Sequence, residues 1–169
     1  MHVSATRSPP SMSMNKKGLE TVIDGVLSQQ GFKKRGSTWY RQNAGTLQAV
    51  DLQKSAYGGQ FYVNLCFAPE GMSVEGMPFP KVHKCPVWIR IGSAFADHRS
   101  QCEELFDLEQ QGVAEAERTI GIQQILIQLV VPFFNQLRES NDLKLAIENG
   151  TFKGGAVTLA ARKHLGIEP

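Results

Sequence analysis

The sequence predicts an α+β fold: an N-terminal helix, a four-stranded antiparallel β-meander, and C-terminal helices packed on one face of the sheet. Apolar residues repeat every three or four positions near the N-terminus and again after residue 113, as in amphipathic helices. Between these regions, residues 36–68 are rich in aromatic and β-branched side chains and contain two glycine turns. A run of strands followed by a run of helices is typical of the α+β class.

The N-terminal region divides at residue 15. Residues 1–14 are rich in Ser and Pro without an apolar period, which predicts a disordered tail before a single domain over 15–169. A helix is predicted over 16–29, where Asn15 can cap the start and Gly31 ends it. The apolar positions of this helix are Leu19, Val22, Ile23, Val26 and Leu27.

Two turn signals, Asn43-Ala44-Gly45 and Gly58-Gly59, separate the first three predicted strands. These strands are 36–42, 46–55 and 60–68. At the first turn, Gly45 predicts a three-residue loop with a bulge, whose register is ambiguous by one residue. The face occupied by Trp39 therefore stays open.

A two-residue loop at Gly58-Gly59 predicts the register of the second hairpin. The predicted opposed pairs are Tyr57 with Gln60, Val50 with Phe67, Leu52 with Leu65, and Gln53 with Asn64. Because side chains alternate between the faces of a sheet, each face has its own set of residues. One face holds Val50, Leu52, Phe61, Val63, Leu65 and Phe67. The other holds Asp51, Gln53, Ser55, Tyr62, Asn64 and Cys66.

The rest of the chain begins with a long connection, Pro69 to Pro86, rich in Gly, Met and Pro. After it, we predict a fourth strand over 87–91 and a helical turn near 101–105. A helix follows over 113–131, which Pro132 ends or kinks. The next helix is capped by Ser140 and ends at Gly150, and a last helix runs from Gly155 to Gly166. The predicted core is Val22, Ile23, Val26, Val50, Leu52, Val63, Leu65, Ile89, Ile91, Ile125, Leu129 and Phe133.

Composition restricts the classes of function. The formal net charge of the 169 residues is only +2, which gives no electrostatic reason to expect nucleic acid or an anionic membrane as a partner. The most apolar stretch, 120–134, is interrupted by Gln and Pro and is too short to span a bilayer. Three cysteines without a signal peptide favour reduced thiols and a cytoplasmic protein. No cofactor loop or catalytic motif is recognised.

The run Gly31-Phe32-Lys33-Lys34-Arg35-Gly36-Ser37-Thr38-Trp39-Tyr40-Arg41, together with Leu52-Gln53-Lys54-Ser55 and Phe61-Tyr62-Val63-Asn64-Leu65, resembles a widespread bacterial domain family of unknown function. The resemblance covers about residues 16–140 and rests on the order and spacing of these segments. It implies a small bacterial α+β domain. It brings no established activity and no catalytic residue.

The polar face of the predicted sheet is the principal candidate site. Three strands contribute to it, so its side chains converge in one patch. An arginine there suits a carboxylate or phosphate, and a tryptophan suits a flat group. A solvated outer face is the alternative, since such faces are polar by default. The candidate ligand- or partner-binding residues are Asp51, Gln53, Tyr62, Asn64, Trp88 and Arg90.

Three further constellations are weaker. His83, Cys85, His98 and Cys102 have the donor types of a zinc site but not the usual spacing, so no metal is expected. Cys66 is the only plausible nucleophile, yet it lies mid-strand, where nothing lowers its pKa. Lys33, Lys34, Arg35 and Arg41 beside Trp39 and Tyr40 could contact single-stranded nucleic acid, but a short charge run is more often a solvated turn.

These observations favour a non-catalytic binding module that uses the polar face of its sheet. Its partner would be another protein, a second copy of the chain, or a small ligand; neither nucleic acid nor a membrane is expected. The alternative is a small-molecule enzyme with a pocket around Gln53, Asn64 and Arg90, in which Asp51 would need help to act as a base.

Overall fold

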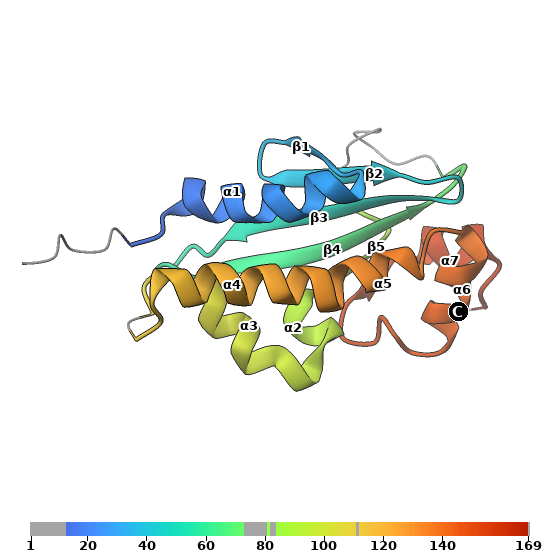
Figure 1. Ribbon diagram of the computed structural model, residues 1–169. Coiled ribbons are helices and arrows are strands. Elements are labelled where there is room, and N and C mark those ends of the chain that lie inside the picture. Colours follow the sequence, from blue (N-terminus) through green and yellow to red (C-terminus); the bar gives the residue numbers. More distant parts are fainter. Residues whose placement is uncertain (1–12, 73–80, 82–83, 111, 169) are drawn as a thin grey trace, which may run out of the picture.

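The computed structural model describes residues 13–72, 81, 84–110 and 112–168, and it confirms the α+β class (Figure 1). One antiparallel sheet has its strands in sequence order, from β1 to β6. The sheet has six strands rather than four. Their bounds are β1 (Lys33–Arg35), β2 (Thr38–Gln42), β3 (Thr46–Lys54), β4 (Phe61–Pro69), β5 (Val87–Arg90) and β6 (Ala156–Val157).

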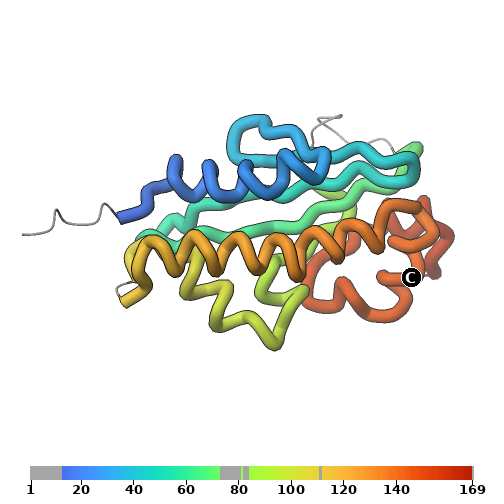
Figure 2. Tube along the Cα trace, in the orientation of Figure 1, coloured from blue at the N-terminus to red at the C-terminus, as the bar shows by residue number. Residues whose placement is uncertain are grey.

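The helices lie on one face of this sheet, where α1 contacts α4 and the trace of the two can be followed side by side (Figures 1 and 2). The N-terminal helical elements are α1 (Lys16–Leu27) and η1 (Ser28–Gln30). Those after the sheet are α2 (Ile91–Ala94), η3 (Ala96–His98), α3 (Arg99–Phe106), α4 (Glu115–Ile125), η4 (Leu126–Val130), α5 (Val131–Asn135), α6 (Ser140–Glu148) and α7 (Leu159–Leu165).

The two strands that the sequence did not predict are the two edges of the sheet. β1 consists of two lysines and an arginine, which have low strand propensity. β6 has only two residues and lies where the last helix was expected to begin. That helix instead begins after Thr158, whose side chain accepts a hydrogen bond from the Ala161 N–H at 3.1 Å.

The β3–β4 register differs from the predicted one by two residues. Val50 lies opposite Leu65, Leu52 opposite Val63, and Gln53 opposite Tyr62. The loop spans four residues because the Ser55 N–H donates to the Gln60 carbonyl at 2.9 Å. An even shift leaves every side chain on its face, so the predicted pairs are wrong while both predicted faces are correct.

The β2–β3 turn also differs from its prediction. The Asn43 N–H donates to the Thr46 carbonyl at 2.8 Å, so the chain reverses over Ala44 and Gly45 without the predicted bulge. Gly45 does not have a positive φ. A Cβ there would lie 2.6 Å from the Glu139 Cα, so close approach, rather than backbone freedom, requires this glycine.

A continuous helical segment runs from Glu115 to Asn135, and Pro132 does not end it. One wide turn, η4, ends two residues before the proline, and there the Val131 N–H donates to the carbonyl of Leu126, five residues back. Pro132 has no N–H and crowds the carbonyl four residues earlier, which accounts for a local change of helix type. The predicted helical turn near 101–105 lies within α3.

The start of α6 corrects another prediction. The N-cap residue is Glu139, which makes no side-chain capping hydrogen bond. The Ser140 hydroxyl instead donates to the Gly45 carbonyl at 2.6 Å. Ser140 therefore links α6 to the β2–β3 turn rather than capping the helix.

The main core fills the space between the helices and the inner face of the sheet. Every predicted core residue is buried except Val22, Leu129 and Phe133, which are half-buried and pack against it. Trp39 lies opposite Val50 and is fully buried on this inner face. Phe67 packs against the rings of Phe133, Phe134 and Phe152.

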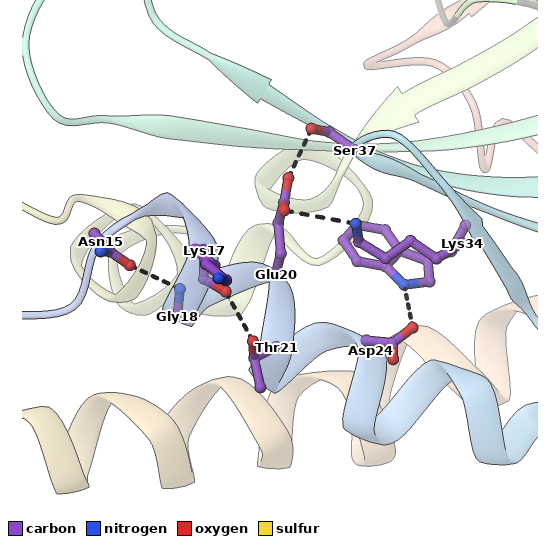
Figure 3. A network of polar contacts seen from close by, with 9 residues as sticks. Asn15, Lys17, Gly18, Glu20, Thr21, Asp24, Lys34 and Ser37 are labelled. Carbon is purple, nitrogen blue, oxygen red and sulfur yellow. Dashed lines mark hydrogen bonds and ion pairs between the residues drawn. The ribbon is translucent and has the colours of Figure 1, made fainter.

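Polar contacts attach α1 to the β1–β2 hairpin (Figure 3). Glu20 accepts a hydrogen bond from the Ser37 hydroxyl at 2.8 Å and forms an ion pair with Lys34 at 3.6 Å. Asp24 accepts from the indole N–H of Trp39 at 3.0 Å. Asn15 caps α1 as predicted, its side chain accepting from the Gly18 N–H at 2.9 Å.

No single helix of the described chain has the length and apolar character needed to cross a membrane. The helix over 115–135 and α6 reach that length and composition only as a pair, with a bend of 105° between them. The predicted tail falls largely on residues 1–12, which lie outside the described residues.

Candidate functional site

The outer face of the sheet, which no described helix covers, has an apolar part and a polar part. In the apolar part, Trp88 packs half-buried against Tyr40, Ala49, Cys66 and Cys85. The polar part is formed by the remaining candidate residues, Asp51, Gln53, Tyr62, Asn64 and Arg90. The structure therefore brings five of the six candidates together and places Trp88 at the border.

A chain of hydrogen bonds crosses the polar part. The Thr38 hydroxyl donates to Asp51 Oδ1 at 2.7 Å. The Asn64 amide donates to Asp51 Oδ2 at 3.3 Å and to Gln53 Oε1 at 3.1 Å. The predicted Asn64–Gln53 contact is present, but it is diagonal, because Asn64 lies opposite Asp51. Asp51 thus has two donors and acts as a structural acceptor.

Arg90 differs from its polar neighbours. The centre of its guanidinium lies 4.0 Å from the centroid of the Tyr62 ring, a cation–π contact. Its Nε is shielded from solvent and has no hydrogen-bond partner among the described groups. Arg90 forms no ion pair with a carboxylate of the described residues.

Beside Arg90, the sheet has a gap along β4. β5 pairs with β4 only from Asn64 onward, and on the other side Gln60 forms an isolated bridge with Asp107. Residues 61–63 lie between these two pairings, because α2 begins at Ile91 and carries the chain away from the sheet. We call the cavity of about 260 Å³ at this gap the β4 notch.

The β4 notch has an apolar floor and a charged rim. The floor comes from β4 and α3 and consists of Phe61, Val63, Cys102 and Phe106, all buried. The rim includes Tyr62, Arg90, Arg99 and Glu103. A concave site with an apolar lining and a few polar groups is typical of small-ligand pockets.

Arg99 and Glu103 are one helical turn apart on α3, where opposite charges usually pair. They form no ion pair here, and the Arg99 Nε donates instead to the carbonyl of Gly92 at 3.1 Å. Sequence reasoning did not select either residue. The i, i+4 spacing of opposite charges around Cys102 was the available signal, but such spacing occurs on many solvated helices.

The thiols of Cys66 and Cys102 are poor nucleophiles. Burial, with a smaller effect from Glu103, raises the pKa of Cys102 to about 11. Burial, followed by the neighbouring thiol of Cys85, raises the pKa of Cys66 well above its usual value. Both thiols are therefore protonated at neutral pH, and only the thiolate attacks.

The candidate zinc donors do not converge in the structure. Cys85 lies in the outer-face cluster, Cys102 faces the inner core, and His98 is exposed on η3. Within the described ranges no three residues of the types His, Cys, Asp and Glu are arranged to hold a metal ion. His83 lies outside those ranges.

The basic and aromatic residues of 33–41 do not form one surface either. Lys33, Lys34 and Arg35 are exposed on β1, whereas Trp39 is buried on the inner face and Tyr40 on the outer face. Arg41 is 6% exposed and donates to Gln48, Asn135 and the carbonyl of Gln30. Buried rings are not available for stacking on bases.

Comparison with known proteins identifies one family. A family model described as a domain of unknown function (DUF4304) matches residues 23–136. Searches of curated proteins and of solved structures each gave no match. The matched range includes the polar part of the outer face and all residues of the β4 notch.

Proposed function

Since the chain belongs to this family of unknown function, DUF4304, we propose its role from its geometry: a non-catalytic binding module that holds a small carboxylate ligand in the β4 notch. One observation carries the proposal. Arg90 has a shielded, unpartnered Nε and lies at the rim of a cavity with a second arginine, Arg99. A guanidinium fork matches the two oxygens of a carboxylate, and the stack on Tyr62 holds its plane in place.

The notch supports a ligand better than the rest of the polar face does. Asp51, Gln53 and Asn64 already bond to one another, so a partner would have to compete with those contacts. Arg90 and Arg99 have no such competing carboxylate among the described residues. The notch is also concave, which lets a small molecule bury most of its surface.

Binding without catalysis follows from the groups that line the notch. The Cys102 thiol, with its pKa of about 11, is not an activated nucleophile at neutral pH. Glu103 is the single carboxylate of the lining, and it is exposed. A general acid and base poised near neutral pH would require a second, shielded titratable group.

The proposed setting is the cytoplasm of a bacterial cell. All three cysteines are free and buried, which suits a reducing compartment. The near-neutral net charge of +2 suits a small solute or a protein partner better than a polyanion.

Titration with 3-phenylpropionate, followed by two-dimensional NMR, tests the proposal. We expect chemical-shift changes confined to residues of the notch. The dissociation constant should be about 10- to 100-fold higher in Arg90→Ala, because a charge-assisted hydrogen bond is lost. Lys33→Ala is the matched control: it removes the same charge from β1, which does not line the notch.

Circular dichroism establishes that each variant is folded, and Arg99→Ala provides a second weakened variant if Arg90→Ala unfolds. If phenylpropionate shifts no notch resonance, or if Arg90→Ala and Lys33→Ala bind it as the wild-type protein does, the proposal is wrong. A protein that instead binds the polar face would perturb Asp51 and Gln53 and leave Cys102 and Glu103, on the α3 side of the notch, unchanged.

A further inference from the structure

Resting on the proposed function, we infer that the ligand of the β4 notch is a zwitterion: an α-amino acid with an apolar side chain. Its carboxylate binds Arg90 and Arg99, its ammonium group faces Glu103, and its side chain lies on the apolar floor. The ammonium group thus adds a second charge requirement to the carboxylate site.

The charges of the rim are the first argument. Two cations and one anion line the same cavity, and none of them forms an ion pair within the described chain. A ligand with one negative and one positive group complements this set. A phosphate or a dicarboxylate would gain from the arginines but would be repelled by Glu103.

The placement of the charges is the second argument. Arg99 and Glu103 are one turn apart on α3, which puts their Cβ atoms roughly 5–6 Å from each other. The Arg99 Nε bond to the Gly92 carbonyl, at 3.1 Å, draws this side chain toward the start of α2 and toward Arg90, two residues earlier. Positive charge is thus concentrated at the β5 end of the notch, with Glu103 one turn further along α3.

The floor is the third argument. Phe61, Val63, Cys102 and Phe106 lie at the base of the cavity, and although each is at most 4% exposed, none of these side chains carries a charge at neutral pH. Such a surface favours an apolar side chain and penalises a charged one, which would be desolvated without a partner. The cavity of about 260 Å³ suits a molecule of the size of one amino acid.

Three probes that differ only in their charged groups test the inference: L-phenylalanine, 3-phenylpropionate without the ammonium group, and L-phenylalanine amide without the carboxylate. We expect phenylalanine to bind about three- to tenfold more tightly than phenylpropionate, since the pair with an exposed Glu103 is screened. The amide is expected to bind most weakly.

Glu103→Gln separates the two charge requirements. In this variant phenylalanine should lose its advantage over phenylpropionate, while phenylpropionate itself binds at least as well as before. Glu104→Gln is the matched control, because Glu104 is also exposed on α3 but does not line the notch. It should keep the preference for phenylalanine.

The outcomes distinguish the two proposals. If phenylpropionate binds in the notch as tightly as phenylalanine, or if Glu103→Gln keeps the preference, the ligand is not a zwitterion and the carboxylate site stands. If none of the three probes binds, both proposals are wrong.

Discussion

Arg41 and Arg118 are buried, have no carboxylate partner among the residues that the structure describes, and both donate to several oxygen acceptors. The Arg118 guanidinium donates to the carbonyls of Glu104, Leu105 and Gln110, where α3 ends. Carbonyls at a helix C-terminus have no partners in the helix and are partly negative, so they suit a cation. Burial and the nearby Arg138 lower the pKa of Arg41 to about 10, which leaves it charged at neutral pH. The Nε of Arg118 is also shielded and unpartnered, but its Nη groups donate to three carbonyls. The Arg90 guanidinium makes no hydrogen bond within the described residues and lies at the rim of the β4 notch, which indicates binding rather than structure.

Also at the residue scale, the pH dependence of Cys102 alkylation should show that its thiol is protonated. Folding raises its pKa from 9.0 to about 11, so the rate of alkylation by iodoacetamide should keep rising about tenfold per pH unit up to about pH 10. In the urea-unfolded chain, the rate of alkylation of Cys102 should approach a plateau near pH 9. Because folding favours the neutral thiol, the stability from this group is complete below about pH 9 and is lost as the pH rises through about 11.

Peptide-resolved mass spectrometry separates Cys102 from Cys66 and Cys85. In Glu103→Gln the rate for Cys102 should increase at a given pH, since one cause of the raised pKa is removed. A native profile that levels off near pH 9 at a rate close to that of the unfolded chain would contradict the assignment of a shielded thiol in the notch.

At the scale of elements, the first half of β3 provides hydrogen bonds to the C-terminal end of the long helix. The Gln48 amide donates to the carbonyls of Phe134 and Leu137, and the Thr46 hydroxyl contacts those of Leu137 and Arg138. Ser140 adds the bond from α6 to the β2–β3 turn. These contacts bring the turn so close to α6 that a Cβ at Gly45 would overlap the Glu139 backbone.

Two glycine-to-alanine variants should therefore change stability in opposite directions. Gly45→Ala should lower the free energy of unfolding by about 1–3 kcal/mol, because turn and helix must move apart. Gly25→Ala, in the exposed interior of α1 with nothing within 4 Å, should raise it by about 0.5–1 kcal/mol. Urea denaturation measures both. If Gly45→Ala leaves the free energy of unfolding unchanged, the β2–β3 turn and α6 can move apart at little cost.

For the whole molecule, the core extends beyond the range that defines the family. The family model ends at residue 136, yet Leu143, Phe152 and Ala161 are buried and β6 completes the sheet beside β5. Phe152 packs against Phe67 on β4 with ring centroids 5.5 Å apart. Residues after 136 are therefore part of the structure that supports this domain.

Truncation after Gln136 should abolish cooperative folding. Each large apolar side chain that loses its burial costs about 1.5–3 kcal/mol, and several are lost at once from a typical total of about 5–15 kcal/mol. We expect a broad thermal transition by circular dichroism and strong binding of a hydrophobic dye. The full-length chain is the control and should show one sharp transition. A sharp transition in the truncated chain would show that the family range folds by itself.

The sequence predicted those parts of the fold that depend on local periodicity. Alternation along 46–68 identified the inner and outer faces correctly, since Leu65 is buried and Asn64 lies on the polar side. Loop length was not predictable in this way, because the bonds of Ser55 across its turn decide it. The notch was missed for a similar reason. It depends on where β5 stops pairing and α2 begins, which no local pattern encodes.

The two edges of the sheet carry a consequence for behaviour at high concentration. β1 exposes Lys33, Lys34 and Arg35, and β6 offers only two residues. An edge strand that is long, flat and apolar invites another chain to pair with it, whereas short or lysine-rich edges resist such growth. The basic run that was considered as a contact for nucleic acid is thus suited to a different role, because a short and lysine-rich edge disfavours sheet-to-sheet pairing between neighbouring copies and the growth of fibres.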